Sequence, residues 1–501
     1  MEKSIIIIGA GIAGLAAGCY AQMNGYRSQI FEMHNKPGGL CTSWKHKDYT
    51  IDGCLHWLVG SSPGNNFHNI WRELGALPGP TIIEHDVFIS IEAEGGKVFN
   101  VYTDVDRLEK HMLELAPQDR KTIEKFTVAI RDCSKVELPI DKAPELYGPA
   151  DLPRLAAQML PFLKLMNTWK KVTIEEFAAE FKDPFLRQVF PLTFNLPGFP
   201  MMAVLMTLAW MHQKAAGFPQ GGSLEFSRSI ERQYLKLGGE IHYRSPVDKI
   251  LVSDDKAIGV RVANGTNRHS DIIISAADGH ATLFQMLDGK YMTNKTRKYY
   301  EKMPLFPPLI QVSLGLARSF EGVPRLLLFP LKRPVTIAGK EEKMLGVEIY
   351  NFDPTLAPPG KTVIDVKLYA DYDYWEKLKQ SPKSYKEEKD KIARQVIDLL
   401  EQRFPGLASQ VEMIDVATPM TWERYTGNWR ASFEGWLITT KNFGMSLRKT
   451  LPGLKNFYMC GQWVEPGGGV PSAAMSARNL IQVICKRDKK SFEIKSPNNE
   501  T

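Results

Sequence analysis

The sequence is poor in cysteine and has no apolar run long enough to cross a membrane. Its six cysteines form no Cys-x-x-Cys pair and have no histidine at metal-ligand spacing, so we expect no metal site and interpret them as reduced thiols of a cytoplasmic protein. The most apolar stretch, 199–211, is shorter than the roughly 20 residues that a membrane-spanning helix needs. The apolar segment 5–19 is interrupted by regularly spaced glycines, which favours a glycine loop over a secretory signal.

Neither sign of charge dominates the chain. Its 63 basic and 56 acidic residues give a net charge of +7 over 501 residues. That charge is too dilute to indicate a nucleic-acid partner, although it is compatible with an anionic membrane surface. With 44% hydrophobic residues, the chain is long enough to bury a substantial core and to form more than one domain.

The first functional signal is a glycine loop between a strand and a helix. Residues 4–8 predict a buried strand, 14–24 a helix and 28–32 a second strand, which together open a doubly wound sheet. In the loop Gly9-Ala10-Gly11-Ile12-Ala13-Gly14, the first glycine allows a tight turn, the second lets the backbone approach a pyrophosphate, and the third lets the helix pack on the sheet. The N–H groups at the helix start attract phosphates. Glu32 follows the second strand, where a carboxylate accepts hydrogen bonds from a ribose.

Two further glycine-rich segments indicate which dinucleotide is bound. Pro37-Gly38-Gly39, followed by Thr42, predicts a turn beside a ribityl phosphate. Near the other end, a predicted strand leads to Gly461, and a turn at 465–471 precedes a helix of small residues at 472–477. Such a turn directs backbone N–H groups at the electron-rich edge of a reduced flavin. The combination favours FAD over NAD.

These segments carry a family resemblance. Residues 9–39 and 456–476 resemble the FAD-dependent group of phytoene desaturases, carotenoid isomerases and retinol saturases, within the amine-oxidase-like flavoprotein fold. Residues 38–42 and 49–53, with His56 and Trp57, are similar to the saturase branch. The residues similar to the bacterial phytoene desaturase signature are Phe457, Tyr458, Gly461, Pro466, Gly467, Gly469, Val470 and Pro471.

The loops and the resemblance together imply a set of FAD-binding residues. Two departures from the family stand out: Leu40 replaces an arginine, which leaves phosphate neutralisation to backbone amides or Lys36, and Gln462 replaces a small residue. Two further specific motifs, Pro246-Val247 and Ala276-Ala277-Asp278, complete the set. The expected cofactor-binding residues are Gly9, Ala10, Gly11, Ile12, Ala13, Gly14, Glu32, Met33, Gly38, Gly39, Leu40, Cys41, Thr42, Val247, Ala276, Ala277, Gly461, Gln462, Gly469, Val470, Pro471 and Ala474.

The predicted fold class is α/β, with a Rossmann-type FAD-binding domain built from discontinuous segments and an inserted α+β substrate domain. Helical periodicity dominates 104–213, and strands return from 240 onward. We assign 1–103, 214–289 and 418–486 to the FAD-binding domain, 104–213 and 290–417 to the substrate domain, and 487–501 to a disordered charged tail.

The resemblance implies hydride transfer between a carbon chain and the flavin, which desaturates, saturates or isomerises C=C bonds of an isoprenoid, carotenoid, retinoid or similar lipid. His56 and Trp57 are the candidate catalytic residues at the flavin, because a histidine side chain can donate a proton, although a packed core histidine explains this pair as well. The methionine-rich stretch 200–211 suits an adaptable tunnel wall or a simple core. An amine or amino-acid oxidase, a reduced-flavin isomerase and a non-catalytic FAD-stabilised lipid carrier remain alternatives.

Two partners are expected beside the lipid. The chain lacks a second nucleotide-binding loop in a strand–loop–helix context, so electrons are expected to enter or leave through a diffusible donor or acceptor. The segment 152–166 combines apolar residues with Arg154 and Lys164, which is typical of a helix lying on a membrane surface, and a packed helix broken at Pro161 is the alternative.

Overall fold

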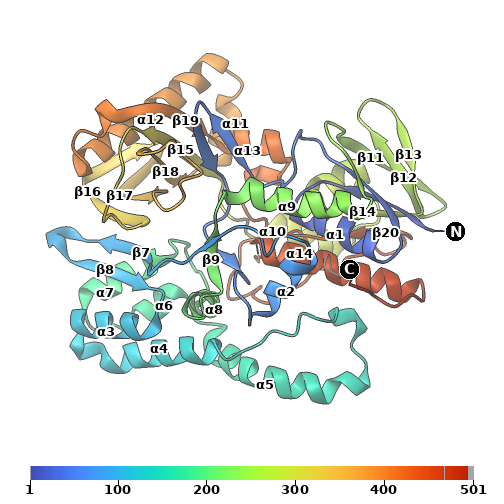
Figure 1. Cartoon of the computed structure of the whole chain (residues 1–501), viewed down its shortest axis with the longest axis horizontal. Coiled ribbons are helices and arrows are strands. Elements are labelled where there is room, and N and C mark those ends of the chain that lie inside the picture. Colours follow the sequence, from blue (N-terminus) through green and yellow to red (C-terminus); the bar gives the residue numbers. More distant parts are fainter. Residues whose placement is uncertain (1, 468, 495–501) are drawn as a thin grey trace.

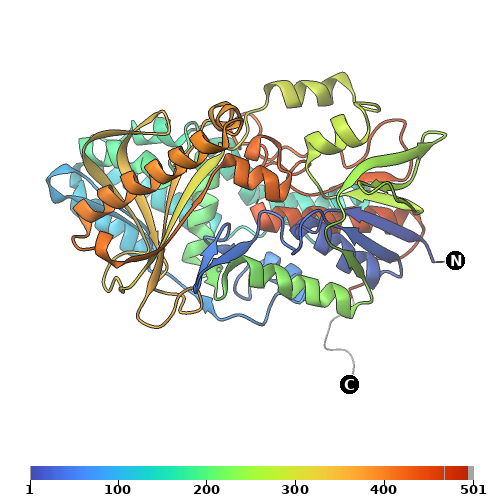
Figure 2. The ribbon, with the colours of Figure 1, turned by 90° about the horizontal axis from the view of Figure 1, so that it is seen from above.

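The computed structural model describes residues 2–467 and 469–494. Figure 1 shows a parallel sheet with its helices on the right, a larger sheet on the upper left, and a group of helices below that larger sheet. The view from above in Figure 2 shows the two sheets at opposite ends of the long axis, with the first and last segments of the chain both at the parallel sheet.

Five short strands from distant parts of the chain form the parallel sheet. The isoleucine-rich strand β1 lies between β2 and β14, and its side chains are buried in the cores on both faces of the sheet, which explains its unbroken apolar run. The strand order is β10 (Glu240–His242), β2 (Arg27–Phe31), β1 (Ser4–Ile8), β14 (Ile272–Ser275) and β20 (Phe457–Met459).

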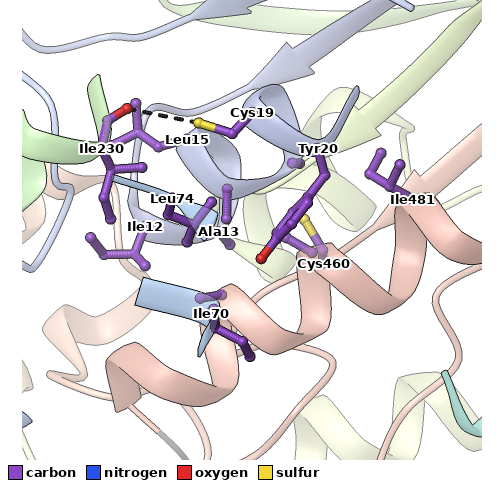
Figure 3. Close-up of a cluster of buried hydrophobic side chains, with 14 of the residues drawn as sticks. Ile12, Ala13, Leu15, Cys19, Tyr20, Ile70, Leu74, Ile230, Cys460 and Ile481 are labelled. Atoms are coloured by element: carbon purple, nitrogen blue, oxygen red, sulfur yellow. Dashed lines mark hydrogen bonds between the residues drawn. The ribbon is translucent and has the colours of Figure 1, made fainter. Parts of the chain in front are cut away.

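Three helices and a small antiparallel sheet cover the two faces of the parallel sheet. Helix α1 packs against α9 and α14, and Figure 3 shows Ile12 and Tyr20 of α1 among side chains of its neighbours. The same figure shows the Cys19 thiol directed at the carbonyl of Ile230. The opposite face packs on β11 and β12 through residues such as Val260. The elements are α1 (Ile12–Met23), α9 (Gly222–Lys236), α14 (Gly469–Arg487), β11 (Val247–Ser253), β12 (Lys256–Val262), β13 (Asn267–His269), a π-helix (Ala281–Met286) and α10 (Asn294–Lys302).

Short strands connect the two halves of the molecule. β3 and β4 form a hairpin beside the N-terminus of α9, and β9 pairs with β5 and β6 as the chain returns from the helical group. These elements are β3 (Ser43–His46), β4 (Tyr49–Asp52), β5 (Leu58–Val59), α2 (Asn66–Glu73), β6 (Ile82–Ile83) and β9 (Ala216–Pro219).

The larger sheet has seven strands, and all its pairings are antiparallel except that of β16 with β7. Helices α11, α12 and α13 contribute to the core on one face, and α3 to α8 contribute to the core on the other. The strand order is β19 (Val411–Ala417), β15 (Leu309–Leu316), β18 (Thr362–Tyr369), β17 (Lys340–Ile349), β16 (Leu326–Ile337), β7 (Val87–Glu92) and β8 (Val98–Tyr102). The helices are α11 (Tyr372–Leu378), α12 (Pro382–Arg403), α13 (Pro419–Thr426), α3 (Val105–Leu115), α4 (Arg120–Cys133), α5 (Leu152–Trp169), α6 (Ile174–Ala178), α7 (Pro184–Val189) and α8 (Met201–His212).

Three local expectations differ from the structure. Strands β7 and β8 belong to the seven-stranded sheet, although the sequence placed them in the FAD-binding domain, because β7 pairs with β16 far along the chain. Helix α5 continues through Pro161 without a break. The expected tail is packed as far as its described residues reach: the N–H of Glu493 donates to the side chain of Asn24, and the ring of Phe492 lies 5.8 Å from that of Tyr20. Residues 495–501 lie outside the described residues.

Candidate active site

One cavity of about 1070 Å³ lies between the two sheets. It begins where β1 and β2 end, at the edge where open α/β sheets bind ligands. Four residues expected at the cofactor, Ala10, Gly14, Thr42 and Ala474, do not line it. The expected residues that do line it are Gly9, Gly11, Ile12, Ala13, Glu32, Met33, Gly38, Gly39, Leu40, Cys41, Val247, Ala276, Ala277, Gly461, Gln462, Gly469, Val470 and Pro471.

The glycine loop has the geometry that close backbone approach requires. Gly9 has a φ of +95°, a left-handed conformation that favours glycine. A side chain at Gly14 would place its Cβ 1.9 Å from the carbonyl oxygen of Gly9, so Gly14 acts by packing α1 against the end of β1. A Cβ at Gly11 would meet no atom closer than 3.9 Å, so the space above Gly11 opens into the cavity.

Glu32 is buried beside this loop and bound to the backbone. One carboxylate oxygen accepts from the N–H of Ala10 at 2.6 Å and the other accepts from the N–H of His34 at 2.7 Å. Burial raises the pKa of Glu32 despite these bonds. Each oxygen keeps a second lone pair, so the carboxyl can hold the loop and still face a ribose hydroxyl. Ala10 thus contributes through Glu32 and not through the cavity wall.

The second glycine turn lies directly against the first. The N–H of Gly38 donates to the carbonyl of Ala10 at 2.9 Å, and Gly11 and Gly38 form a parallel bridge. Lys36, which the sequence offered as a phosphate partner, instead donates to the carbonyl of Ser43 at 2.6 Å. Lys36 is thus bound to the backbone, and the groups left to face a phosphate are the backbone amides of the two loops and the start of α1.

The C-terminal turn closes the same end of the cavity. The N–H of Gly461 donates to the hydroxyl of Ser476 in α14. The Gln462 amide donates to the side chain of Asn428 at 3.0 Å, so this departure from the family is anchored within the protein. Glu465 forms an ion pair with Lys449 at 3.3 Å and does not line the cavity.

The far part of the cavity is apolar and lies among the helices and the seven-stranded sheet. One face of helix α8 lines the cavity. Met201 and Met202, also on α8, are buried in the core of the helical group. The methionine-rich stretch is therefore partly a cavity wall and partly core. The apolar lining in this part consists of Leu138, Phe162, Leu192, Phe194, Leu196, Phe199, Ala203, Met206, Trp210, Phe306, Leu309, Leu328, Leu368 and Phe433.

His56 and Trp57 both line the cavity, and His56 is held by a buried ion network. Its Nδ1 lies 3.0 Å from Glu348, which is 4% exposed and also lies 3.0 Å from the ammonium of Lys367. Arg325 donates to the carbonyl of His56 at 2.6 Å. Burial alone would raise the pKa of Glu348, but the His56 and Lys367 charges hold it well below the usual range. The carboxylate thus stays ionised and orients the His56 ring.

Two acidic residues of the cavity were missed as functional candidates. Glu434 lines the cavity, and its carboxylate would lie 2.7 Å from a Cβ placed at Gly469. No hydrogen-bond partner for this carboxyl exists among the described residues, and burial raises its pKa to about 7. Asp278 accepts from the N–H groups of Ala281 and Trp429, and burial raises its pKa to about 7 as well. Asp278 stood in a noted motif, whereas no sequence signal surrounds Glu434.

The chain matches one protein family along most of its length. The pattern described as "Flavin containing amine oxidoreductase" covers residues 12–484.

Several proteins of known name are similar to the chain over nearly its whole length. Prolycopene isomerase 2 of an Oncidium hybrid cultivar is 25% identical, with 95% of this chain and 82% of the relative covered. The lycopene-forming phytoene desaturase of Pseudescherichia vulneris is 23% identical, with 96% and 99% covered. The all-trans-retinol 13,14-reductase of Danio rerio is 22% identical, with 92% and 82% covered. The predicted resemblance is thereby confirmed.

A solved structure confirms the fold class. A triple mutant of putrescine oxidase superposes with a TM-score of 0.62 at 13% identity, and 97% of this chain and 99% of that chain are covered. At this identity the likeness concerns the fold alone.

The cavity fits the FAD that the family requires. Space without side chains lies above Gly11, the first turn of α1 has no side-chain cap and no acidic residue, and the second glycine turn lies beside it. A dinucleotide pyrophosphate needs this combination of open backbone and unpaired N–H groups. FAD is the cofactor of this protein.

Replacing Gly11 or Gly14 with alanine separates cofactor binding from folding. Gly14→Ala forces α1 away from Gly9, so we expect a loss of about 3 kcal/mol in the free energy of unfolding and a loss of flavin. Gly11→Ala has room within the protein, so the apoprotein should keep its stability but bind FAD at least about tenfold more weakly. Urea unfolding of the apoproteins and fluorescence titration with FAD measure the two effects. Equal FAD affinity in Gly11→Ala and the parent would contradict the pyrophosphate assignment.

Proposed function

The chain belongs to the family of flavin-containing amine oxidoreductases, and from this membership and its cavity we propose that it is an FAD-dependent oxidoreductase acting on C=C bonds of an apolar isoprenoid, carotenoid or retinoid-like lipid. The relatives named for prolycopene, phytoene and retinol support this substrate class. Desaturation, saturation and isomerisation all occur among those names, so the proposal covers the bond type and not the direction.

The observation that carries the proposal is the continuity of the cavity. Its polar end is formed by the glycine loops, and its walls become apolar toward α8 and the seven-stranded sheet. At about 1070 Å³ it slightly exceeds the roughly 300–1,000 Å³ typical of a single small-molecule site, which supports a site that holds a lipid beside the cofactor. Apolar walls bind a hydrocarbon chain by removing it from water.

The protein's own residues position the lipid and handle its protons. When bound, FAD supplies the exchange of electron pairs. The aromatic and aliphatic walls hold the chain in an extended pose and exclude water from the reacting carbons. We infer that Glu434 donates the proton to the double bond, because its carboxyl faces the cavity beside Gly469 of the C-terminal glycine turn and has no described hydrogen-bond partner. The Nδ1 atom of His56 is hydrogen-bonded to Glu348. His56 and Trp57 therefore form part of the cavity wall.

The electron partner is proposed to be a diffusible donor or acceptor, such as a quinone or oxygen. The family resemblance supports this, together with the lack of a second glycine-loop motif in the sequence.

The function is tested by anaerobic absorbance spectroscopy of the purified holoprotein. Polyene and retinoid candidates are added separately to the oxidised and the reduced forms, and product analysis follows each addition. Bleaching or return of the flavin bands with a lipid, or isomerisation by the reduced form without net electron transfer, is the expected result. Release of hydrogen peroxide with amines would instead favour an amine oxidase. A flavin that no lipid or amine affects, in a protein that binds lipid, would favour a carrier.

The pH dependence of turnover tests Glu434. Because the donor is the protonated carboxyl, the rate of lipid conversion should be highest below pH 7 and fall as the pH rises through about 7. Glu434→Gln should lower turnover by about 100-fold or more and remove this limb of the profile, while Glu434→Asp should keep it. Flavin absorbance verifies that both variants bind FAD. A rate that rises through pH 7 would identify Glu434 as a base of the reverse reaction, and an unchanged profile in Glu434→Gln would exclude it.

We also propose that α5 lies on an anionic membrane from which the lipid enters. The side chains of Leu152, Leu160 and Leu163 are 57%, 53% and 55% exposed, and the helix contains Arg154 and Lys164 but no acidic residue. Phe162, on the same helix, lines the cavity, so the exposed face and the apolar cavity share one element. Within the described residues, no helix is long and apolar enough to cross a bilayer.

Vesicle co-sedimentation tests this surface. The holoprotein should bind vesicles of phosphatidylcholine and phosphatidylglycerol, and Leu160→Ser with Leu163→Ser should weaken binding by at least about tenfold, because two leucines no longer enter the lipid. Leu235→Ser on α9, a leucine of similar exposure on another helix, serves as the control and should bind as the parent does. Absence of vesicle binding by the parent protein would overturn the membrane proposal and leave the flavin chemistry untouched.

A further inference from the structure

Two cysteines that form no sequence motif meet at the open end of a hairpin. Ser43 pairs with Asp52 at the end of the β3–β4 ladder, and the N–H of Gly53 donates to the carbonyl of Thr42 one step beyond. The next opposed positions in this antiparallel register are Cys41 and Cys54. Directly opposed residues have Cα atoms about 4.5–5.5 Å apart, which is within the range that a disulfide spans.

Both thiols lie on the face of the hairpin that is directed toward α9, and both line the cavity. Successive strand residues alternate in direction, so Cys41 and Cys54 point to the side of Ser43 and Asp52, which bind the N-terminus of α9. Consistent with this, the Cys41 thiol lies 3.6 Å from the carbonyl of Ser223. Both cysteines line the cavity together with the flavin-binding glycines.

We propose that Cys41 and Cys54 form a reversible disulfide that exchanges an electron pair with the flavin, so that the site stores two electron pairs. Closing the S–S bond breaks both S–H bonds and releases two electrons and two protons. Oxidised FAD accepts both electrons and both protons, and the reverse reaction restores the two thiols and the oxidised flavin. The balance requires no other oxidant or reductant. The inference depends on the bound flavin and not on the identity of the lipid.

The environment of Cys54 lowers its reactivity toward dissolved thiols. The neighbouring Cys41 thiol and then burial raise the pKa of Cys54 well above its usual value, so at neutral pH it is a protonated thiol and a poor nucleophile toward solutes. The Glu434 carboxyl is close enough to add to this effect. A carboxyl that can relay the thiol protons is therefore near the pair.

The test is an anaerobic reductive titration combined with thiol mapping. Air-oxidised holoprotein is titrated with dithionite while the flavin absorbance is followed, and samples are denatured, alkylated and analysed by mass spectrometry. We expect the wild-type protein to take up two electrons more per flavin than Cys54→Ser or Cys41→Ser. We also expect Cys41 and Cys54 to be protected from alkylation before the titration and modified after it.

Cys460→Ser is the matched control. Cys460 is a buried cysteine that also lines the cavity, but it follows β20 and lies outside the hairpin. The Cys460→Ser variant should take up as many electrons per flavin as the wild-type protein. The mapping on wild-type protein decides the question even if a variant loses its flavin. Free thiols at both positions in the air-oxidised protein would overturn the proposal, and so would a disulfide that survives complete reduction of the flavin. Neither result depends on finding a lipid substrate.

Discussion

The close packing of α1 on the end of β1 is the constraint on which the rest of the site depends. With Gly14 against the carbonyl of Gly9, the helix starts directly beyond the strand and its first N–H groups face the cavity. The bridge between Gly11 and Gly38 then places the second glycine turn against the first. Glu32 holds the loop from the neighbouring strand. A shift of this helix would move every phosphate-facing group together.

The cavity changes character along its length because two different folds build its two ends. At the parallel sheet, glycines leave backbone exposed, which suits a charged dinucleotide. Toward the seven-stranded sheet and α8, aromatic and aliphatic side chains remove water. Between them lies the buried network of His56, Glu348 and Lys367, whose opposite charges compensate one another. The polar, glycine-lined end of the cavity and its apolar end are therefore adjacent but distinct.

The β3–β4 hairpin and the residues on either side of it contribute to both ends of the cavity. It runs from the second glycine turn through Cys41, returns along β4 to Cys54, and continues to His56 and Trp57. The hairpin pairs Ser43 with Asp52 and brings the segments on either side of it together, so one short piece of chain contributes expected cofactor residues, two thiols and part of the cavity wall. Its attachment to the N-terminus of α9 through Asp52 keeps these groups in register.

The sequence by itself determined the dinucleotide unit, because the glycines at 9–14 and the acid at 32 act within a local strand–loop–helix whose geometry follows from neighbouring residues. Most of the cofactor-binding residues that were predicted from the sequence line the cavity. The tertiary structure decided what depends on distant contacts: β7 and β8 join a sheet whose other five strands come more than 200 residues later, Lys36 turns to a backbone carbonyl, and Glu434 reaches the cavity without any local motif. The burial that raises the pKa of Glu434 arises only when separate segments pack together, and no sequence spacing encodes it.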